Sequence, residues 1–429
     1  MNSQRYECDV LIVGAGPAGL AAAYRVFESG REATVVDDNP HAGGQIWRGE
    51  KEKSASTSAR AWFERIRNSK IRFINGARVF QQPHERVLLA ELDTEFCELT
   101  YEKLILATGA RERFLPFPGW TLPNVMGAGG LQALVKTGLS IKGKRVVVAG
   151  SGPLLLAVAD NLKRKGAAIL AIAEQAPRGS LMRFGFGLIS QSGKASQAYD
   201  LKRRLRGVKY LTGCWPVAAH GTDKLERITL RQNSRDWDIE CDYLAYGFHL
   251  VPNLELAELL GCKIDRGAVS VNEFQQTSMA NVYCAGEATG IGGLELSLVE
   301  GEIAGLAAAG QTARARGLFG FRDKQRKFAS LLNRTFELRS ELRQLPRADT
   351  IVCRCEDVEF ERLRQSGSWR EAKLHSRCGM GPCQGRICGS AVEFLFGWKV
   401  ESVRPPVFPV RVGSIAGDSP KSNVQSPKS

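Results

Sequence analysis

The chain has 429 residues, of which 43% are hydrophobic and 24% are charged, as in ordinary folded proteins. This composition excludes a disordered or fibrous chain and leaves room for two or three domains. The net charge of +14 is spread along the chain, and no helix-turn-helix or RNA-binding sheet pattern accompanies it, so we expect no nucleic-acid partner.

No segment predicts export or membrane insertion. The apolar run Val10–Ala23 follows the acidic Glu7 and Asp9 and is interrupted by glycines, so it is neither a signal peptide nor a membrane span. Eleven cysteines without a secretion signal indicate a reducing compartment, where clustered thiols bind metal more often than they form disulfides. We therefore expect a cytoplasmic protein.

The N-terminal segment predicts a dinucleotide-binding βαβ unit. An apolar strand, Val10–Val13, leads into the loop Gly14–Gly19 and a helix over Leu20–Glu28, and a second strand, Thr34–Val36, ends in an acidic residue. The glycines permit a tight turn and let a pyrophosphate lie against the backbone, while the acid is placed to bind a ribose hydroxyl. The residues expected to hold the dinucleotide are Gly14, Gly16, Pro17, Ala18, Gly19 and Asp37.

Later segments are typical of flavoproteins with two dinucleotide-binding domains. The strand Lys103–Leu106 leads into a Thr-Gly pair, and the strand Asn281–Ala285 leads into a Gly-Glu pair and a glycine-rich helix. These segments return the chain to the first unit, so the FAD-binding domain is expected to be discontinuous, over residues 1–115 and 275–345. They add Gly44, Gln45, Thr108, Gly109, Gly286 and Glu287 to the expected cofactor-binding residues. Glu287 stands where Asp is common, which leaves open whether its longer side chain reaches the flavin's ribityl chain.

A second βαβ unit lies within residues 116–274. The strand Lys144–Ala149 is followed by a Gly-Ser-Gly-Pro-Leu-Leu loop, and Glu174 follows the next strand. Leu155 takes the place of the third glycine, where a bulky side chain interferes with close helix-to-strand packing. We interpret the unit as a degenerate NAD(P)-like Rossmann domain. Three interpretations of the unit stay open: an empty structural remnant, a site for a bound nucleotide, and a working NAD(P)H site.

Two C-terminal stretches have a distinctive composition. Arg314–Arg347 combines dense positive charge with apolar residues at helical spacing, which fits a solvated amphipathic helix or a docking surface for another subunit or for lipid headgroups. Residues 416–429 are rich in Ser, Pro and Lys and predict a flexible tail.

Four cysteines within residues 346–415 predict a small metal-binding domain. They form a C-x-C pair and a later C-x4-C pair, and thiolates this close together need a cation. Gly379 and Gly381 let the backbone wrap around the site, and Pro382 indicates that Cys383 lies at a helix N-terminus. We favour a [2Fe-2S] cluster over zinc or no metal, because structural zinc usually draws on C-x2-C knuckles. The expected ligands are Cys353, Cys355, Cys378 and Cys383, whereas Cys388 is expected only to pack.

Other reactive constellations are missing from the sequence. Disulfide-reducing flavoproteins carry a pair of cysteines beside the flavin, but none follows Gly43-Gly44-Gln45 or lies in the second βαβ unit, so we exclude thiol chemistry. The five histidines have neither metal nor triad spacing. We identify no catalytic acid or base.

Several runs of sequence resemble one known family. The chain is similar over residues 5–415 to the alpha subunit of hetero-oligomeric, dye-linked amino-acid dehydrogenases, which include opine oxidases, D-hydroxyproline and L-proline dehydrogenases, and hydrogen cyanide synthase. Its cysteine segment resembles the [2Fe-2S] module of bacterioferritin-associated ferredoxin. The runs that carry the resemblance are Gly43–Arg48, Ala107–Trp120, Cys353–Glu356 and Cys378–Arg386.

The resemblance implies a subunit that transfers electrons. In that family a beta subunit resembling D-amino-acid dehydrogenase oxidises the amino or imino acid at its own flavin, and a small ferredoxin-like subunit is often present. The alpha chain contributes FAD or another nucleotide and sometimes shares an FMN at the subunit interface. It passes electrons toward a quinone chain or a dye, which implies a peripheral association with the inner face of the membrane.

From the sequence we predict an α/β, two-dinucleotide-binding flavoprotein with an inserted NAD-like domain and a small C-terminal [2Fe-2S] domain. Its predicted function is electron transfer, through FAD and the cluster, within a dehydrogenase for a secondary amine or imino acid of the opine or D-hydroxyproline type. The alternatives are a self-sufficient NAD(P)H-dependent reductase and a non-catalytic, nucleotide-binding assembly subunit.

Overall fold

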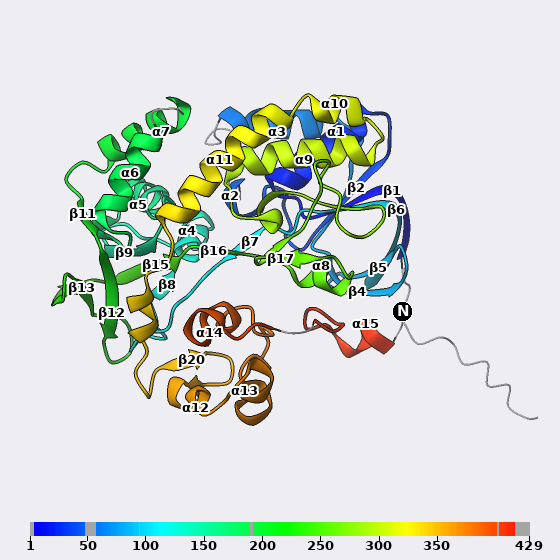
Figure 1. The fold of residues 1–429 in the computed structure, drawn as a ribbon. Coiled ribbons are helices and arrows are strands. Elements are labelled where there is room, and N and C mark those ends of the chain that lie inside the picture. The colour runs from blue at the N-terminus through cyan, green and yellow to red at the C-terminus, as the bar shows by residue number, and fades with distance from the viewer. Residues whose placement is uncertain (1–3, 48–56, 94, 189–191, 401–402, 417–429) are drawn as a thin grey trace, which may run out of the picture.

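The computed structural model describes residues 4–47, 57–93, 95–188, 192–400 and 403–416, and it shows two main sheets flanked by helices above a small C-terminal domain (Figure 1). The predicted α/β class is confirmed. Arg48 and residues 417–429 of the predicted tail lie outside the described residues. Among the described helices, none is long and apolar enough to cross a membrane.

The first sheet has seven strands drawn from distant parts of the chain. Its order is β3-β2-β1-β6-β5-β4, and β19 pairs in parallel with β6. The segment after residue 281 therefore completes a sheet that begins at residue 4. The strands are β1 (Gln4–Val13), β2 (Ala33–Asp37), β3 (Arg72–Asn75), β4 (Arg78–His84), β5 (Val87–Glu91), β6 (Phe96–Leu106) and β19 (Val282–Cys284).

Two helices on this sheet pack closely because one of them carries glycines at the contact. A Cβ atom at Gly301 would lie 2.1 Å from the carbonyl oxygen of Ala18, and one at Gly305 would lie 2.3 Å from that of Ala22. The glycine-rich helix α9 thereby lies against α1, beside which it runs in Figure 1. The helices of this region are α1 (Pro17–Glu28), α2 (Gly44–Trp47), α3 (Thr57–Arg67), η1 (Gly286–Thr289), α9 (Leu294–Ala308), α10 (Thr312–Arg316) and α11 (Phe319–Thr335).

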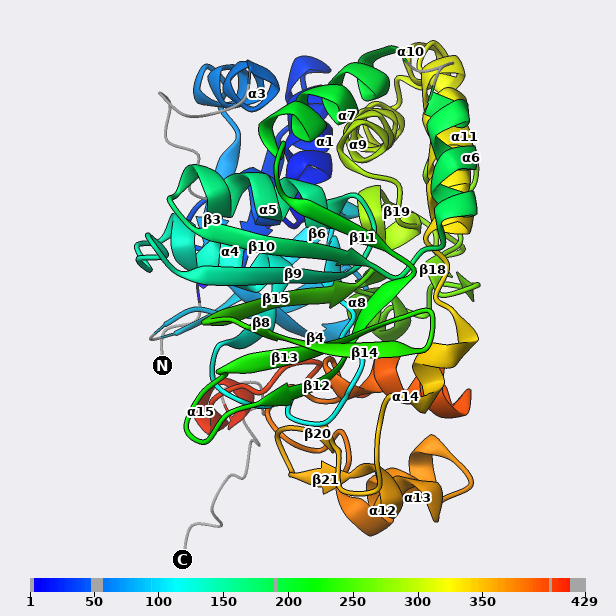
Figure 2. The same cartoon turned by 90° about the vertical axis from the view of Figure 1, so that its left-hand side faces the viewer.

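The second sheet has five parallel strands in the order β11-β10-β9-β15-β8, and a three-stranded antiparallel sheet, β12-β13-β14, lies beside it (Figure 2). Its strands are β8 (Val125–Gly127), β9 (Arg145–Ser151), β10 (Ala168–Glu174), β11 (Lys209–Thr212) and β15 (Tyr243–Phe248). The antiparallel strands are β12 (Cys214–His220), β13 (Arg227–Gln232) and β14 (Arg235–Glu240). The helices are α4 (Ala128–Lys136), α5 (Leu154–Arg164), α6 (Arg178–Leu188) and α7 (Ser192–Arg204).

Short elements join the two sheets. Strand β7 (Ala110–Glu112) pairs with β16 (Leu250–Pro252), which places the outgoing and returning connections side by side. Helix α8 (Glu255–Leu259) and the hairpin of β17 (Ile264–Asp265) and β18 (Ala268–Val269) follow.

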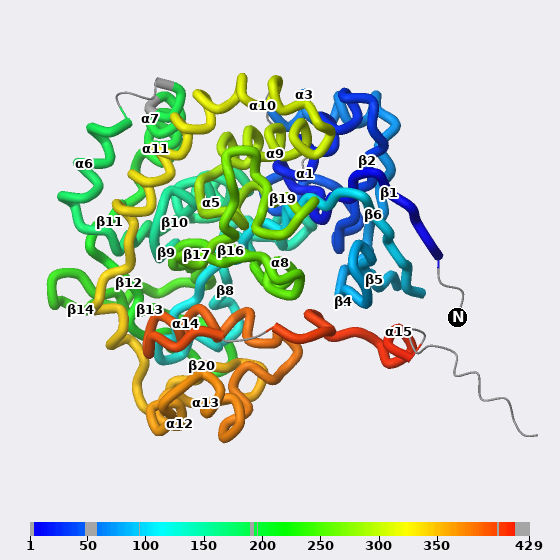
Figure 3. Tube along the Cα trace, turned by 45° about the vertical axis from the view of Figure 1, so that its right-hand side comes forward, coloured from blue at the N-terminus to red at the C-terminus, as the bar shows by residue number. Residues whose placement is uncertain are grey.

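The C-terminal domain is small, and the chain leaves it to return to the first sheet. It contains β20 (Ile351–Cys353), β21 (Val358–Glu359), α12 (Phe360–Arg364), α13 (Trp369–Ser376) and α14 (Cys388–Phe396). The preceding η2 (Ser340–Gln344) packs Leu342 into the core of the second sheet. Residues 403–416 then run toward β4 and β5 (Figure 3), where the Val407 amide donates to the Phe80 carbonyl at 2.9 Å and Arg411 pairs with Glu91 at 3.0 Å. The last described element, α15 (Val412–Ala416), includes the first residue of the predicted tail.

Candidate functional site

The first glycine loop forms a cradle free of side chains at the N-terminus of α1. Gly14 has a φ of +109°, and a Cβ at Gly19 would lie 1.8 Å from the Gly14 carbonyl oxygen, so neither position accepts a side chain. The Ala15 amide donates to the Asp37 carboxylate at 2.5 Å, which fixes the acid at the loop. Gly14 and Gly16 remain partly exposed.

The other expected cofactor-binding segments converge on this loop. The Gly43 amide donates to the Ala15 carbonyl at 2.8 Å, and a Cβ at Gly44 would lie 2.9 Å from the Gly16 Cα. A Cβ at Gly286 would lie 2.8 Å from the Cβ of Ala18. Gln45 is exposed at the rim. Segments that are far apart in the sequence therefore build one surface.

Thr108 and Gly109 are held by a residue that the sequence analysis did not single out. The Thr108 hydroxyl donates to the Asn253 carbonyl at 2.8 Å, the Asn253 side-chain amide donates to the Thr108 carbonyl at 2.8 Å, and the Asn253 backbone amide donates to the Gly109 carbonyl at 3.0 Å. This exchange fixes the turn after β6 against the return connection.

The Glu287 carboxylate is engaged by its own loop. It accepts hydrogen bonds from the backbone amides of Gly292 at 3.2 Å and Gly293 at 2.8 Å, just before α9. Burial raises the pKa of Glu287 to about 6, and the two amides act against that rise. The longer side chain thus reaches the turn before α9, so its role differs from that expected of an Asp facing the ribityl chain.

A buried network that was not predicted from the sequence lies behind this loop. Glu300, 2% exposed, accepts hydrogen bonds from the Gly286 amide and the Thr289 hydroxyl, and it pairs with Arg326 of α11 at 2.9 Å. An acidic residue inside an apolar, glycine-rich helix was the available signal, because a buried carboxylate needs partners. Trp47 is 1% exposed, and its indole N–H has no hydrogen-bond partner among the described residues.

The second glycine loop is covered by the protein's own chain. Gly150, Ser151 and Gly152 are all buried. The Ser151 hydroxyl donates to the carbonyl of Phe336, a residue that follows α11, at 3.0 Å. The amide side chain of Gln175 donates to the Ser151 hydroxyl at 2.9 Å and to the Glu337 carbonyl at 3.1 Å.

Side chains complete this cover. The ring of Phe336 lies 5.4 Å from that of Phe184 in α6, and the Arg339 amide donates to Gln175 at 3.3 Å. Residues Phe336–Arg339 therefore occupy the surface of the loop that a dinucleotide would need.

Two residues of the second unit have structural roles here. Glu174 is 0% exposed and accepts from the amides of Gly152 and Ala176, each at 2.8 Å, and burial raises its pKa to about 7. Leu155 is 1% exposed and packs in a core with Val146 and Val148 of β9. The position that Gly19 holds in the first unit is therefore held by Leu155, a core residue, in the second.

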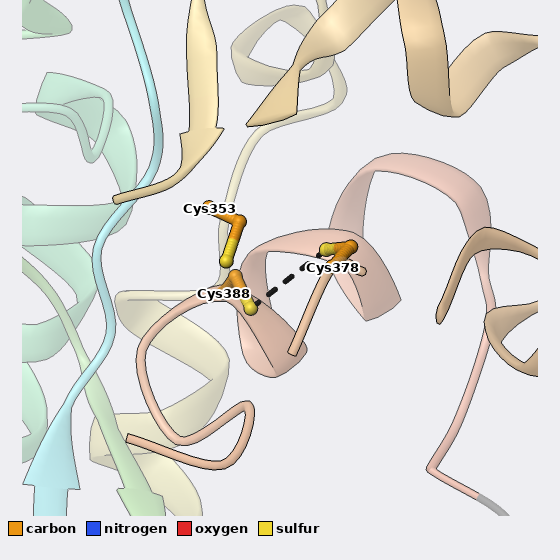
Figure 4. Close-up of side chains that lie close together, drawn as sticks. All are labelled: Cys353, Cys378 and Cys388. Atoms are coloured by element: carbon orange, nitrogen blue, oxygen red, sulfur yellow. Dashed lines mark hydrogen bonds between the residues drawn. The ribbon is translucent and has the colours of Figure 1, made fainter. Parts of the chain in front are cut away.

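Five cysteines gather in the C-terminal domain, in two groups. The sulfur atoms of Cys353, Cys378 and Cys388 lie within 4.8 Å of one another (Figure 4), and the Cys378 thiol lies 3.9 Å from that of Cys388. Hydrogen bonds from the Cys378 and Cys388 thiols lower the pKa of Cys353 to about 2. Cys388, which the sequence analysis assigned only to packing, therefore lies within the thiol cluster.

Cys355 and Cys383 form the second group. Burial is the largest cause of the raised pKa of Cys355, and hydrogen bonding to the Cys383 side chain adds to it. Cys355 is exposed and Cys383 is half-buried, whereas the other three are buried. A Cβ at Gly381 would lie 2.3 Å from the Cys355 Cβ, so this glycine permits the close approach of the two loops.

One local expectation about this loop was wrong. Cys383 was expected at a helix N-terminus, but α14 begins at Cys388. Gln384 and Gly385 have φ values of +50° and +78°, in the left-handed region, so the backbone turns once more before the helix starts. The cysteine at the helix start is the one that the sequence analysis had not placed in the site.

The remaining cysteines are structural. Six lie outside the C-terminal domain, and all are buried and free. Burial raises the pKa of each thiol, to about 12 for three of them, so none is a thiolate at neutral pH. The six are Cys8, Cys97, Cys214, Cys241, Cys262 and Cys284.

Comparison with known proteins places this geometry in context. The sequence model of the family described as pyridine nucleotide-disulphide oxidoreductase matches residues 8–314. The HcnB subunit of hydrogen cyanide synthase from Pseudomonas protegens is 30% identical over 422 residues, covering 88% of this chain and 89% of HcnB. An opine oxidase subunit from Rhizobium meliloti is 28% identical over 463 residues, covering 95% of this chain and 87% of that protein.

A solved structure shows the same fold. The crystal structure of L-proline dehydrogenase from P. horikoshii superposes with a TM-score of 0.66 at 18% identity, covering 97% of this chain and 80% of that one. The predicted two-dinucleotide-binding flavoprotein fold is therefore confirmed.

Proposed function

Because the chain belongs to the pyridine nucleotide-disulphide oxidoreductase family, we propose that it is the FAD- and [2Fe-2S]-bearing electron-transfer component of a multi-subunit dehydrogenase. The observation that carries the proposal is the presence in one chain of an open dinucleotide cradle and of five cysteines gathered in two neighbouring groups. A flavin takes up two electrons together and an iron–sulfur cluster passes them one at a time, so a chain with both links a two-electron donor to one-electron acceptors.

The first cradle fits FAD. Gly14, Gly16 and Gly19 would take the pyrophosphate at the N-terminus of α1, and Asp37 would take a ribose hydroxyl. The Gly43–Gly44 turn, which packs against the first glycine loop, would border the cofactor. Thr108, Gly109 and Gly286 would border the rest of the cofactor.

The division of the thiols favours two metal ions over one. A single tetrahedral zinc needs four donors around one centre, whereas a [2Fe-2S] cluster has two irons with two thiolates each. Here three sulfurs form one group and two form the other. Cys355 and Cys383 would hold one iron, and Cys353 would hold the other together with Cys378 or Cys388.

We place the oxidation of the substrate on a partner protein. Among the described residues the site contains no acid–base pair suited to it, and the two relatives named above are themselves parts of multi-subunit enzymes. A secondary amine or imino acid of the opine or D-hydroxyproline type is the proposed substrate class, and the opine oxidase relative supports it. The partners would be an amino-acid-dehydrogenase-like beta subunit and a small ferredoxin-like subunit, with an FMN at the interface and a quinone chain or dye as acceptor.

The alternative of an NAD(P)H-dependent reductase is disfavoured. Its nucleotide would have to enter the second glycine loop, where Phe336–Arg339 already lie. Electrons would therefore enter from the partner.

Single Cys→Ser variants of the five clustered cysteines test the metal assignment, with iron and acid-labile sulfide measured in each purified protein. We expect about two irons per chain in the unaltered protein and a loss of at least half of them when Cys353, Cys355 or Cys383 is replaced. Of Cys378→Ser and Cys388→Ser, only one should lose iron, which identifies the fourth ligand. Cys262→Ser, at a buried thiol outside the cluster, is the control. Zinc in place of iron would contradict the assignment.

A further inference from the structure

A cavity of about 640 Å³ lies where the C-terminal domain meets the first domain. One wall comes from α8 and the β17–β18 hairpin and the other from α13, α14 and the loop before α14, which face each other in Figure 1. This volume is in the range of sites that hold small molecules. The cavity is separate from the first glycine loop, none of whose residues line it.

The wall of the cavity is strongly basic. Its innermost cations are Arg111 and Arg386, which both approach Glu255, at 2.9 and 3.7 Å. Arg111 also donates to the Arg386 carbonyl at 3.0 Å, so this group joins the two domains. Against Glu255, Glu258 and Glu393, the wall carries five further cations that form no ion pair with any described residue. They are Arg266, Arg370, Lys373, Lys399 and Arg404.

Within the described residues, the Ser390 hydroxyl is an unpaired polar group that lies behind this wall and is shielded from the cavity. This residue of α14 lines the cavity, is 6% exposed, and has a buried hydroxyl with no hydrogen-bond partner among the described residues. Buried hydroxyls are normally paired because leaving one unpaired costs free energy.

We propose that this cavity binds a small molecule carrying a diphosphate group. Unpaired arginines and lysines from both domains would contact the phosphate oxygens. Guanidinium groups suit this role because they bind phosphate through two parallel hydrogen bonds. The diphosphate belongs either to a nucleotide or to inorganic pyrophosphate, and the cations recognise the same group in both.

The ligand would lie next to the thiol cluster. Gly385 and Arg386, on the cavity wall, directly follow the loop of Cys383, and Trp369, also on the wall, packs against Gly379 and Gly385. A bound polyanion would lower the reduction potential of a cluster held by Cys383, because nearby negative charge makes it harder to add an electron to the cluster. This consequence rests on the proposed function, whereas binding itself requires no iron.

Calorimetric titration of the FAD-saturated full chain with sodium pyrophosphate, and separately with ADP, tests the site. Saturation with FAD keeps both probes out of the first glycine loop. We expect binding of both, and a loss of affinity of about tenfold or more in the double variant Arg370→Gln/Lys373→Gln, which removes two unpaired cations from α13. The matched control is Lys324→Gln/Lys327→Gln, which removes two exposed cations at the same spacing from α11.

Ser390→Ala is a second control. It removes a hydroxyl that is shielded from the cavity, so the affinity for pyrophosphate should stay unchanged. Equal affinities for pyrophosphate and ADP would mean that only the phosphates are recognised, and tighter binding of ADP would mean that the nucleoside contributes. The proposal is overturned if neither probe binds the unaltered protein, or if the α11 control loses as much affinity as the α13 variant. Both outcomes can be scored in protein without iron, so they are separate from a failure of the cluster assignment.

Discussion

Gly14-x-Gly16 and Gly150-x-Gly152 occupy the same place in two βαβ units of this chain, each between a parallel strand and a helix. In both, an acid at the end of the next strand accepts from a loop amide: Asp37 from Ala15 and Glu174 from Gly152. The first loop stays partly exposed, whereas the second is buried beneath residues that follow α11.

The difference lies largely outside the two motifs. The residues that close the second loop come from Phe336 and Glu337, far along the chain, and from Gln175 just after β10. A glycine motif therefore sets the backbone of a loop, while a distant segment decides whether a ligand reaches it. Leu155 is the one local difference that agrees with this outcome, since it belongs to the core of the second unit.

The largest expected effect is loss of the cofactor from the open loop. In Gly16→Val, the added Cβ would meet no atom closer than 3.9 Å, and the φ of Gly16 is −73°, so the fold accepts the side chain. The side chain would instead fill the space for the pyrophosphate and weaken FAD binding by about a hundredfold or more, an effect of about 3 kcal/mol. The loss of FAD is measured as the flavin absorbance per mole of folded protein. Full flavin content in this variant would contradict the assignment of the first loop.

The corresponding change in the covered loop should affect stability alone. Leu155→Ala removes a buried side chain from a packed core and should lower the free energy of unfolding by about 2–5 kcal/mol. Flavin content should stay at the level of the unaltered protein. Urea denaturation and visible absorbance of the same sample report the two quantities, and loss of flavin before unfolding would show that the second unit holds the cofactor.

The buried Glu174 should make stability depend on pH. Its pKa rises from 4.5 to about 7 on folding, so between these values the folded protein holds a proton that the unfolded chain has lost. The free energy of unfolding should therefore fall as pH rises through this window, by about 3 kcal/mol at most. Glu174→Gln cannot titrate, so its stability relative to the unaltered protein should increase over the same window. A difference that is constant from pH 4.5 to 7.5 would contradict the burial of this carboxyl.

A smaller effect should follow from weakening the hydrogen bonds that hold Phe336–Arg339 over the second glycine loop. Ser151→Ala removes the hydrogen bonds that its hydroxyl makes with Phe336 and Gln175, at a cost of about 1 kcal/mol in unfolding free energy. Limited proteolysis after Phe336 should become faster, since the segment is held less firmly. Unchanged cleavage together with unchanged stability would show that these bonds do not hold the cover.

Much of the fold was predictable because its signals are local. The strand–glycine loop–helix order and the acid after the second strand follow from short-range geometry, and so does the glycine-rich helix α9, whose Gly301 and Gly305 meet α1. The helix α1 begins at Pro17, ahead of the predicted Leu20, because proline suits the first helical position.

The parts of the site that the sequence did not predict depend on distant contacts. Nothing near Gly150 shows that Phe336 will cover it, and nothing near Gly286 names Arg326 as the partner of Glu300. Cys388 was missed for a related reason. Spacing alone favoured the C-x4-C pair of Cys378 and Cys383, although an equal spacing separates Cys383 from Cys388, and only the left-handed turn at Gln384 and Gly385 carries Cys388 back to Cys353.

The contrast between an open and a covered loop, combined with a two-iron cluster, is tested most directly by an anaerobic visible spectrum. The purified chain is analysed for iron and sulfide, and its spectrum is recorded before and after NADH and then after dithionite. We predict flavin bands and about two irons per chain, a spectrum unchanged by NADH, and bleaching by dithionite. Rapid bleaching by NADH would contradict the closure of the second loop, and zinc without iron would contradict the cluster.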